Sequence, residues 1–457
     1  MNVLMISVDD MRPLLGAYGC PEMITPHIDR LCAEGVRFTR AYCQVPVCGA
    51  SRASLLTGVR PTADRFVSYA SRADQDAPSV PTLLHHLRDN GYELVGNHKV
   101  FHDRADHAAV WHRYLQSRLP GFPGPYYGRD AMRMYDSAMD RPVRAGVPTW
   151  VHAGPAWECE QVEDVAYHDG EAADFAIREI GRLADAAGPW MVAYGSVDVH
   201  LPFTAPKPYW DLYDPTALRL PDHTERPVAI PEQALHAWGE LRNYCGIPAS
   251  GPLDDLAARA LIHGYRAGIS YLDAQIGRIL DVLDRHRLWD STIVVLWVDH
   301  GFTLGEHGLW CKHCLYETAL RVPLIVRAPA SLGLPSGAAI DTVVENLDIY
   351  PTICDLAGLR TPAHVEGRSL IPLLRNAGNT LPGRAYSRYR AGESVRTDRY
   401  RYSEWREDDK IVARTLFDLA VDPDEQCNIA DEETSRSITE SFSSELDALR
   451  GSSRLSG

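Results

Sequence analysis

Residues 3–10 read Val-Leu-Met-Ile-Ser-Val-Asp-Asp (VLMISVDD), a short apolar run that stops at two consecutive carboxylates. The run is rich in strand-forming residues and too short to be a membrane span. Residues 292–298 (TIVVLWV) form a similar run that stops at Asp299 and His300, and residues 189–195 (PWMVAYG) form a third. Nearly continuous apolar strands of this kind are typical of a parallel sheet buried on both faces.

Helical periodicity is present between these runs. Over residues 257–285, apolar side chains recur at spacings of three and four residues: Ile262, Tyr265, Ile269, Leu272, Ile276 and Ile279. Strands that alternate with helices predict an α/β fold with a mostly parallel sheet covered on both faces. In such folds ligands bind beyond the carboxyl ends of the strands.

A second, smaller unit is expected at the C-terminal end. Residues 384–405 alternate in the manner of antiparallel strands, residues 416–431 indicate a strand, a turn and a helix start, and residues 438–449 indicate a terminal helix. We therefore predict a catalytic α/β domain over residues 1–375 and a C-terminal subdomain with a small antiparallel sheet over residues 376–457.

Asp9, Asp10 and Asp299 each follow closely after an apolar strand, so we expect them to meet at one edge of the sheet. Three carboxylates repel one another unless a positive group joins them, and a divalent cation is the simplest such group. Oxygen ligands suit calcium, magnesium or manganese, whereas His300 favours a transition metal slightly. The alternative is that Asp9 and Asp10 cap a turn and Asp299 begins a loop.

Residues 46–58 (PVCGASRASLLTG) place Cys48 among small residues where a helix starts, four positions before Arg52. A helix N-terminus lowers the pKa of a thiol and suits a bound anion. Cys48, or a group made from it, would then meet an anion that Arg52 helps to hold. The alternative is a small buried hydrophobe, as free cysteines usually are.

Composition limits the classes of partner. The chain has 457 residues, 45% of them hydrophobic, and a net charge of -15 from 46 Lys+Arg against 61 Asp+Glu. That charge would repel nucleic acid and anionic membrane surfaces, so neither is an expected partner. The first ten residues lack a basic segment and a long apolar run, so we expect no signal peptide and a cytoplasmic protein. Among the ten cysteines, Cys311 and Cys314 form the only close pair and flank Lys312, which is weak evidence for zinc or redox chemistry.

The motifs together resemble the sulfatase branch of the alkaline-phosphatase-like superfamily, from Asn2 to about Asn428. They are Asp9-Asp10, Cys48-Gly49-Ala50-Ser51-Arg52, Leu56-Thr57-Gly58, Asp299-His300-Gly301 and Gly305-Glu306-His307-Gly308. Within the family, the segments DDMRPLLGAYG, KVFH, VHLPF and DHGFTLGEHGLW are most similar to iduronate-2-sulfatases. The resemblance implies the alkaline-phosphatase-like fold, with a mixed, mostly parallel sheet.

The resemblance also implies roles for individual residues. One divalent cation, calcium in the first place and manganese or magnesium as alternatives, would be held by Asp9, Asp10, residue 48, Asp299 and His300. Cys48 would be oxidised to formylglycine by a formylglycine-generating enzyme, and its hydrate would be the nucleophile. Arg52 would hold the formylglycine, Lys99 and Lys312 would bind sulfate oxygens, His102 would be the base that releases sulfate, and His200 would contact the leaving-group oxygen.

The activity implied is hydrolysis of a sulfate monoester on a small sulfated carbohydrate. We expect an exo-acting enzyme that removes the 2-O-sulfate of a terminal uronic acid or similar sugar, because a net charge of -15 repels a long polyanion. Arg12, Arg104 and His98 are candidates to pair with a sugar carboxylate. Residues 103–162 and 202–255 lack clean periodicity and are expected to shape the substrate pocket.

Two alternatives remain. Ala50 stands where the family motif usually has proline, and Val59 where arginine is frequent. The run CGASRASLLTG also approaches phosphonate monoester hydrolases and phosphodiesterases of the same superfamily, which share the nucleophile. A catalytically inactive binding homologue, with Cys48 unmodified, is the other alternative.

Overall fold

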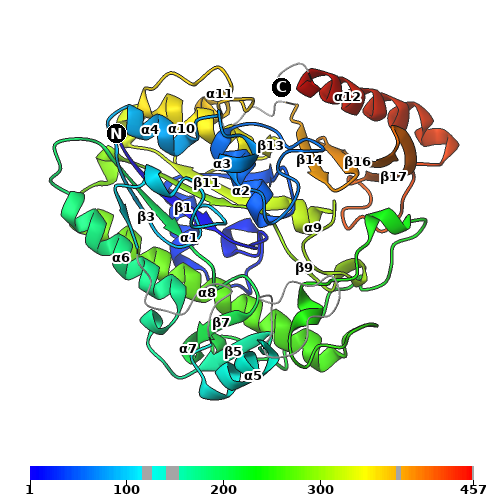
Figure 1. Ribbon diagram of the computed structural model, residues 1–457, viewed down its shortest axis with the longest axis horizontal. Helices are drawn as coiled ribbons and strands as arrows, with labels where there is room; N and C mark the ends of the chain where they lie inside the picture. Colours follow the sequence, from blue (N-terminus) through cyan, green and yellow to red (C-terminus); the bar gives the residue numbers. More distant parts are fainter. Residues whose placement is uncertain (116–125, 140–153, 377–381, 455–457) are drawn as a thin grey trace.

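A computed structural model of the chain describes residues 1–115, 126–139, 154–376 and 382–454 (Figure 1). Within these residues, the largest sheet has nine strands in the order β12-β2-β11-β8-β1-β6-β3-β4, with β13 also paired to β2. The strands are β1 (Asn2–Val8), β2 (Val36–Tyr42), β3 (Glu93–Gly96), β4 (Arg113–Tyr114), β6 (Trp190–Gly195), β8 (Thr292–Val298), β11 (Arg321–Arg327), β12 (Ala338–Ile340) and β13 (Val344–Glu345). The three strands predicted from apolar runs are β1, β6 and β8.

The centre of this sheet is parallel. β1 pairs in parallel with β6 and with β8, whereas β11 runs antiparallel to both β8 and β2. Every residue from Val3 to Val8 and from Thr292 to Val298 is buried, as a sheet covered on both faces requires. The predicted fold class, a mixed and mostly parallel α/β sheet, is confirmed.

Helices pack on both faces of the sheet (Figure 1). One group comprises α1 (Pro26–Glu34), α6 (His168–Leu183) and α8 (Asp255–Arg285), and the other comprises α2 (Cys48–Thr57), α4 (Leu83–Asp89) and α10 (Ile349–Ala357). The helix predicted over residues 257–285 is α8. It begins after Asp254, whose side chain accepts a hydrogen bond from the Ala257 N–H at 2.7 Å and so caps the first turn.

Short elements connect these layers. They are α3 (Ala73–Asp76), β5 (Trp157–Glu160), β7 (Phe203–Pro206), α7 (Lys207–Trp210), β9 (Thr303–Leu304), β10 (Trp310–Cys311), α9 (Glu317–Leu320), α11 (Ile371–Arg375) and α5 (Arg129–Met139). The segments expected to be irregular are residues 103–162 and 202–255. Within the first of them, residues 116–125 and 140–153 lie outside the described residues. In the part of the chain that is described, no helix has the length and apolar character needed to cross a bilayer.

The C-terminal residues form a separate antiparallel sheet, as expected. Its strands β14 (Ala385–Tyr389), β15 (Gly392–Arg396), β16 (Tyr400–Glu407) and β17 (Lys410–Asp418) pair in chain order, and α12 (Arg436–Arg454) packs on them. A small core of its own joins the sheet to the helix: Val395, Tyr402, Leu416, Phe442 and Leu446. The boundary at residue 375 stays a prediction.

A buried cluster of charges joins this sheet to β2 of the large sheet and to α9. Glu317 of α9 accepts hydrogen bonds from Arg401 and from Arg396, the latter at 2.7 Å. Arg401, only 1% exposed, also pairs with Glu425 at 2.7 Å. Both guanidinium groups lie over the ring of Tyr42 at 5.5 Å. Strands β15, which contains Arg396, and β16, which contains Arg401, therefore both contact β2 and α9.

We predict that Glu317→Gln lowers the free energy of unfolding by about 3 kcal/mol, because it leaves two largely buried arginines with too little negative charge. Denaturant titration will measure the change. Glu433→Gln is the matched control, since Glu433 pairs with Arg436 in solvent, and it should have almost no effect. Equal stability of the two variants would contradict the predicted role of the cluster.

Candidate active site

Strand register brings the first acidic residues together. β1 and β8 pair in parallel with Val8 opposite Val298, so Asp9 and Asp299 leave the sheet side by side. The backbone N–H of Asp299 donates to the Val8 carbonyl at 3.2 Å, and the N–H of Asp10 donates to Asp299 Oδ1 at 3.2 Å. The carboxylates of Asp9 and Asp299 therefore lie together at one edge of the sheet, as expected.

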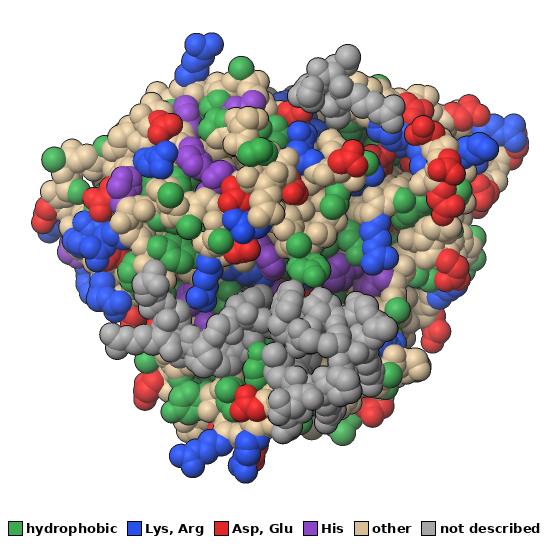
Figure 2. All heavy atoms as spheres, in the orientation of Figure 1, with side chains coloured by type: hydrophobic (Ala, Val, Ile, Leu, Met, Phe, Trp, Pro, Cys, Tyr) green, Lys and Arg blue, Asp and Glu red, His purple; other side chains and the backbone are tan. Residues whose placement is uncertain are grey.

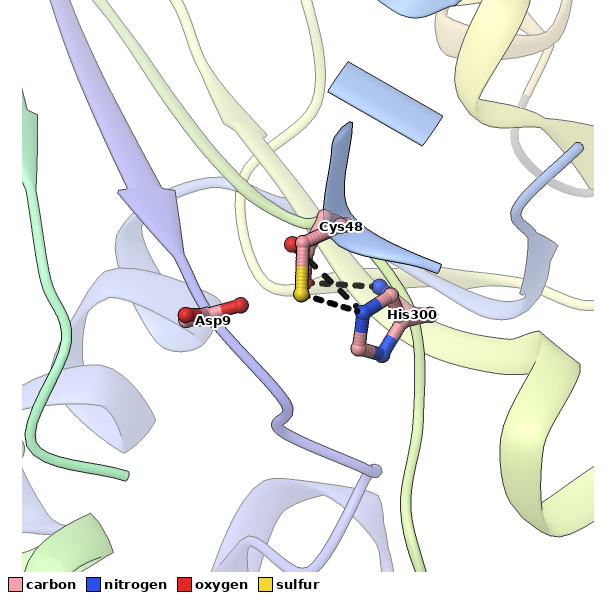
Figure 3. Close-up of side chains that lie close together, drawn as sticks. Asp9, Cys48 and His300 are labelled. Carbon is pink, nitrogen blue, oxygen red and sulfur yellow. Dashed lines mark hydrogen bonds and ion pairs between the residues drawn. The ribbon is translucent and has the colours of Figure 1, made fainter. Parts of the chain in front are cut away.

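Cys48 is the first residue of α2 and points toward this edge (Figure 3). Its Sγ lies 3.1 Å from Nε2 of His300. Gly49 permits the approach of the helix to a neighbouring loop, because a Cβ there would lie 2.1 Å from the carbonyl oxygen of Tyr69. Ligand atoms of Asp9, Cys48, Asp299 and His300 all lie within 4.8 Å of one another. Two of the three carboxylates thus lie beside Cys48 at the start of α2 and His300 after β8.

Arg52 lies one turn further along α2 and is fully buried. Its Nε donates to Asp299 Oδ2 at 2.8 Å, and its Nη1 donates to Ser7 Oγ at 2.8 Å. A third contact, from Nη2 to Asp9 Oδ1, is 3.5 Å long. The guanidinium therefore balances two of the carboxylates and is held in one orientation.

Lys99 and His102 follow β3. The Lys99 ammonium contacts the Asp9 carboxylate. Gly195, at the end of β6, makes room for this segment, because a Cβ there would lie 2.6 Å from the Lys99 backbone. Burial, and then the charge of Lys99, hold the pKa of His102 well below its usual range. A neutral imidazole of this kind can accept a proton.

His200 and Lys312 lie on another side of the cluster. Lys312 Nζ is 2.9 Å from Asp10 Oδ2 and 3.0 Å from His200 Nε2. His200 Nδ1 is 2.5 Å from the Leu201 carbonyl oxygen. Burial and Lys312 act against protonation of His200, but Asp10 and a hydrogen bond with Cys48 raise its pKa to about 10. His200 is therefore suited to donate a proton.

A further residue, Glu240, was missed by the sequence analysis. Its Oε1 lies 2.8 Å from Lys312 Nζ and 3.0 Å from His200 Nε2. Burial acts to raise the pKa of Glu240, but Lys312 and His200 hold it well below the usual range. No motif surrounds Glu240, and its position in the irregular segment 202–255 was the only signal that could have pointed to it.

The residues present fit a divalent cation. Asp9 Oδ1 and Asp10 Oδ1 are buried and accept no hydrogen bond from the described residues, although Arg52 Nη2 lies 3.5 Å from the first and His300 Nδ1 lies 3.1 Å from the second. Carboxylate oxygens with one imidazole suit a hard or borderline cation. A second group, Asp10, Cys48 and His200, also has its ligand atoms within 4.8 Å of one another.

The expected low pKa of Cys48 is wrong for the thiol itself. Burial, and then the charge of Asp9, raise the pKa of Cys48, although Lys312 and Lys99 act in the other direction. The helix terminus is outweighed because the side chain lies among carboxylates and is only 3% exposed. An unmodified Cys48 is therefore a poor nucleophile at neutral pH.

Two of the three candidates for a sugar carboxylate already face a carboxylate of the protein. Arg12 pairs with Glu306 at 2.6 Å, and His98 Nε2 lies 3.6 Å from Glu171. The third, Arg104, is exposed.

Cys311 and Cys314 are buried, free thiols on either side of Lys312. Among the described residues, neither of them belongs to a group that could hold a metal.

Comparison with known proteins gives two family matches. Residues 1–359 match the sulfatase family model, and residues 305–452 match the model for the C-terminal part of N-sulphoglucosamine sulphohydrolase. A sulfatase of Formosa agariphila is 29% identical, over 98% of this chain and 85% of its own. Human iduronate 2-sulfatase is 29% identical, over 89% of this chain and 85% of its own.

Among solved structures, the phosphonate monoester hydrolase of Agrobacterium radiobacter superposes with a TM-score of 0.76. The alignment covers 99% of this chain and 95% of the hydrolase, with 21% sequence identity. At this level of identity the likeness shows a common fold.

Proposed function

This chain belongs to the sulfatase family, and we propose that it is a metal-dependent sulfatase that uses a formylglycine made from Cys48. The family match confirms the resemblance that the motifs indicated. One observation supports the proposal above all: Cys48 starts a helix beside three buried carboxylates, and two lysines, three histidines and an arginine surround the same point. Such a set of charges suits a reaction at a sulfate group.

The charged side chains address the main barrier of the reaction, which is repulsion between sulfate oxygens and an incoming nucleophile. Lys99 and Lys312 would bind sulfate oxygens, while Arg52 would hold residue 48. Asp9, Asp10, Asp299 and His300, with residue 48, would hold a divalent cation. When bound, that cation supplies Lewis-acid stabilisation of negative oxygen.

The formylglycine hydrate carries two hydroxyl groups on one carbon, and this allows the enzyme to be regenerated. One hydroxyl would attack sulfur, and the bond from sulfur to the alcohol oxygen would break as His200 gives that oxygen a proton. His102 would then take the proton of the second hydroxyl. The oxygen left without its proton would form the C=O bond of the aldehyde while the bond from the same carbon to the sulfate oxygen breaks and sulfate leaves, and water would then restore the hydrate. Serine in place of Cys48 has a single hydroxyl group, so its sulfate ester could not be released by a second hydroxyl on the same carbon.

The substrate we propose is a short sulfated carbohydrate. The likeness to human iduronate 2-sulfatase favours an exo-acting enzyme that removes a 2-O-sulfate from a terminal uronic acid or from a similar sugar. The net charge of -15 favours a short ligand over a long polyanion. A formylglycine-generating enzyme would be the maturation partner.

We predict that Cys48 is converted to formylglycine when the chain is produced together with a maturation enzyme, and that turnover rises with the converted fraction. Peptide mass spectrometry of the 48-containing peptide measures the fraction. Cys159→Ser is the control, because Cys159 is exposed and should be dispensable. Full activity in a sample in which Cys48 is only a thiol would contradict the proposal.

Removal of the cation should abolish turnover and lower the melting temperature, because the free energy of metal binding to the folded chain would no longer add to its stability. Elemental analysis of the active protein should find about one divalent ion per chain. Asp299→Asn should lose calcium binding in calorimetry, whereas Asp290→Asn, at an exposed position, should keep it. A metal-free preparation with full activity would exclude this site.

The reaction class can be tested with matched aryl sulfate, sugar sulfate, phenylphosphonate and phosphodiester substrates. We expect a sulfate monoester to have the highest kcat/KM, since two lysines and an arginine surround the site. A preference of about tenfold for a phosphorus substrate, or about 1.4 kcal/mol in transition-state binding, would make phosphonate monoester or phosphodiester hydrolysis the main activity. No turnover of any of the four by converted, metal-loaded protein would indicate an inactive binding homologue.

A further inference from the structure

Glu240 brings a carboxylate to the side of the site where the alcohol would leave. It directly precedes the short helical turn Leu241–Asn243 in the irregular segment 202–255. Leu241 and Tyr244 are buried at 1% and 3% exposure and fix the turn to the body of the protein. The Glu240 side chain is itself 10% exposed, so its position is not that of a mobile surface group.

One carboxylate oxygen of Glu240 contacts other side chains, and the other accepts no hydrogen bond from the described residues. Oε1 contacts Lys312 and His200, the two residues proposed to face the substrate. Oε2 is buried and accepts no hydrogen bond from the described residues, with His313 Nδ1 4.0 Å away. A buried carboxylate oxygen without a donor is unfavourable unless a ligand supplies the donor.

The side chains next to Glu240 Oε2 are aromatic: His313 is the nearest, and His236 and Tyr389 pack against it. His313 lies 5.9 Å from the ring of His236 and 5.7 Å from that of Tyr389. Burial lowers the pKa of His313, and burial with Arg390 lowers that of His236 to about 4, so both rings are neutral at pH 7. Figure 2 shows one face of the molecule, with histidine side chains in its upper left part and in its middle. A carboxylate beside neutral rings suits a polyhydroxy or cationic ligand.

The same arrangement is unfavourable for an anion. A substrate carboxylate near Glu240 Oε2 would be repelled, because the two cationic groups beside Glu240, Lys312 and His200, both face its other oxygen, Oε1, and Lys312 is also shared with Asp10. Arg390 lies against the ring of Tyr389 at 5.3 Å and is exposed at the β14–β15 turn, where its charge is screened by solvent.

We propose that Glu240 is a specificity-determining residue that accepts a hydrogen bond from a hydroxyl or ammonium group of the leaving alcohol and that selects against a sugar carboxylate at that position. The inference rests on the proposed sulfatase function and narrows its substrate class. Of the terminal uronic acid and the similar sugar named above, it favours the second, with a hydroxyl or an ammonium group where the uronic acid has its carboxylate.

The test compares three 2-O-sulfated sugars that differ at one carbon, which carries a hydroxymethyl, an aminomethyl or a carboxylate group. Wild-type enzyme should turn over the hydroxymethyl or the aminomethyl sugar with a kcat/KM about tenfold or more above that of the uronate. The faster of the two identifies the donor. In Glu240→Gln this ratio should fall by about tenfold, because the amide no longer repels the carboxylate.

Ratios are the readout because Glu240 also contacts Lys312 and His200, so the variant will lose activity on every substrate, aryl sulfate included. Glu232→Gln is the matched control: Glu232 lies in the same segment, its side chain is 77% exposed, and the ratio should not change. Arg390→Gln should also leave the ratio unchanged. A wild-type preference for the uronate, an unchanged ratio in Glu240→Gln, or a selective loss of uronate turnover in Arg390→Gln would overturn the inference.

A binding measurement separates this inference from the proposed reaction. The three unsulfated sugars are added to wild-type and Glu240→Gln protein, and melting temperatures are recorded. The hydroxymethyl or aminomethyl sugar should stabilise the wild type more than the uronate does, and the variant should lose this difference. Absence of turnover on all sulfate esters would reject the sulfatase proposal, whereas equal stabilisation by all three sugars would reject the role of Glu240.

Discussion

The requirement that three buried carboxylates be balanced by positive charge governs the arrangement of this molecule. Asp9, Asp10 and Asp299 are all fully buried. Like charges at such short range are strongly unfavourable in a medium that excludes water. Each therefore has a cationic partner from a different part of the chain, Lys99 for Asp9, Lys312 for Asp10 and Arg52 for Asp299. The three cations balance the carboxylates only if α2, the segment after β3 and the segment after β10 all reach the same edge of the sheet.

Parallel pairing explains how distant segments reach that edge. The central strands β1, β6 and β8 have the same direction, so residues after each of them emerge at one end. The crossover helices needed between parallel strands cover both faces and keep the sheet dry. Water exclusion strengthens every ion pair at the strand ends, and it also makes a missing partner costly. The buried charges between α9 and the C-terminal sheet follow the same rule, with Glu317 and Glu425 facing Arg396 and Arg401.

Sequence patterns predicted what depends on local periodicity and on strand ends. The apolar runs gave β1, β6 and β8, and their terminal carboxylates do meet, because hydrophobic burial and strand direction determine both. The low pKa expected for Cys48 was wrong, since it took account of the helix end but not of Asp9, which lies close only in the folded chain. Glu240 could not be found for the same reason. Its significance comes from Lys312 and His200, which are 72 and 40 residues away in the sequence.

The distribution of charge around Cys48 gives the site a direction. On one side Arg52 and Lys99 lie beside Asp9 and Asp299, and a bound cation would add further positive charge there. On the other side Glu240 and Asp10 face Lys312 and His200, so that two negative groups meet two groups able to carry positive charge. A sulfate ester has its charge at one end, and on the proposal above that end would lie between Lys99 and Lys312, with the alcohol toward His200 and Glu240. The alcohol then meets a region with little net charge, where hydrogen bonds rather than ion pairs decide which group is accepted. On these proposals, reaction and specificity would be served by different parts of the chain, the first by residues at strand and helix ends and the second by the irregular segment that carries Glu240.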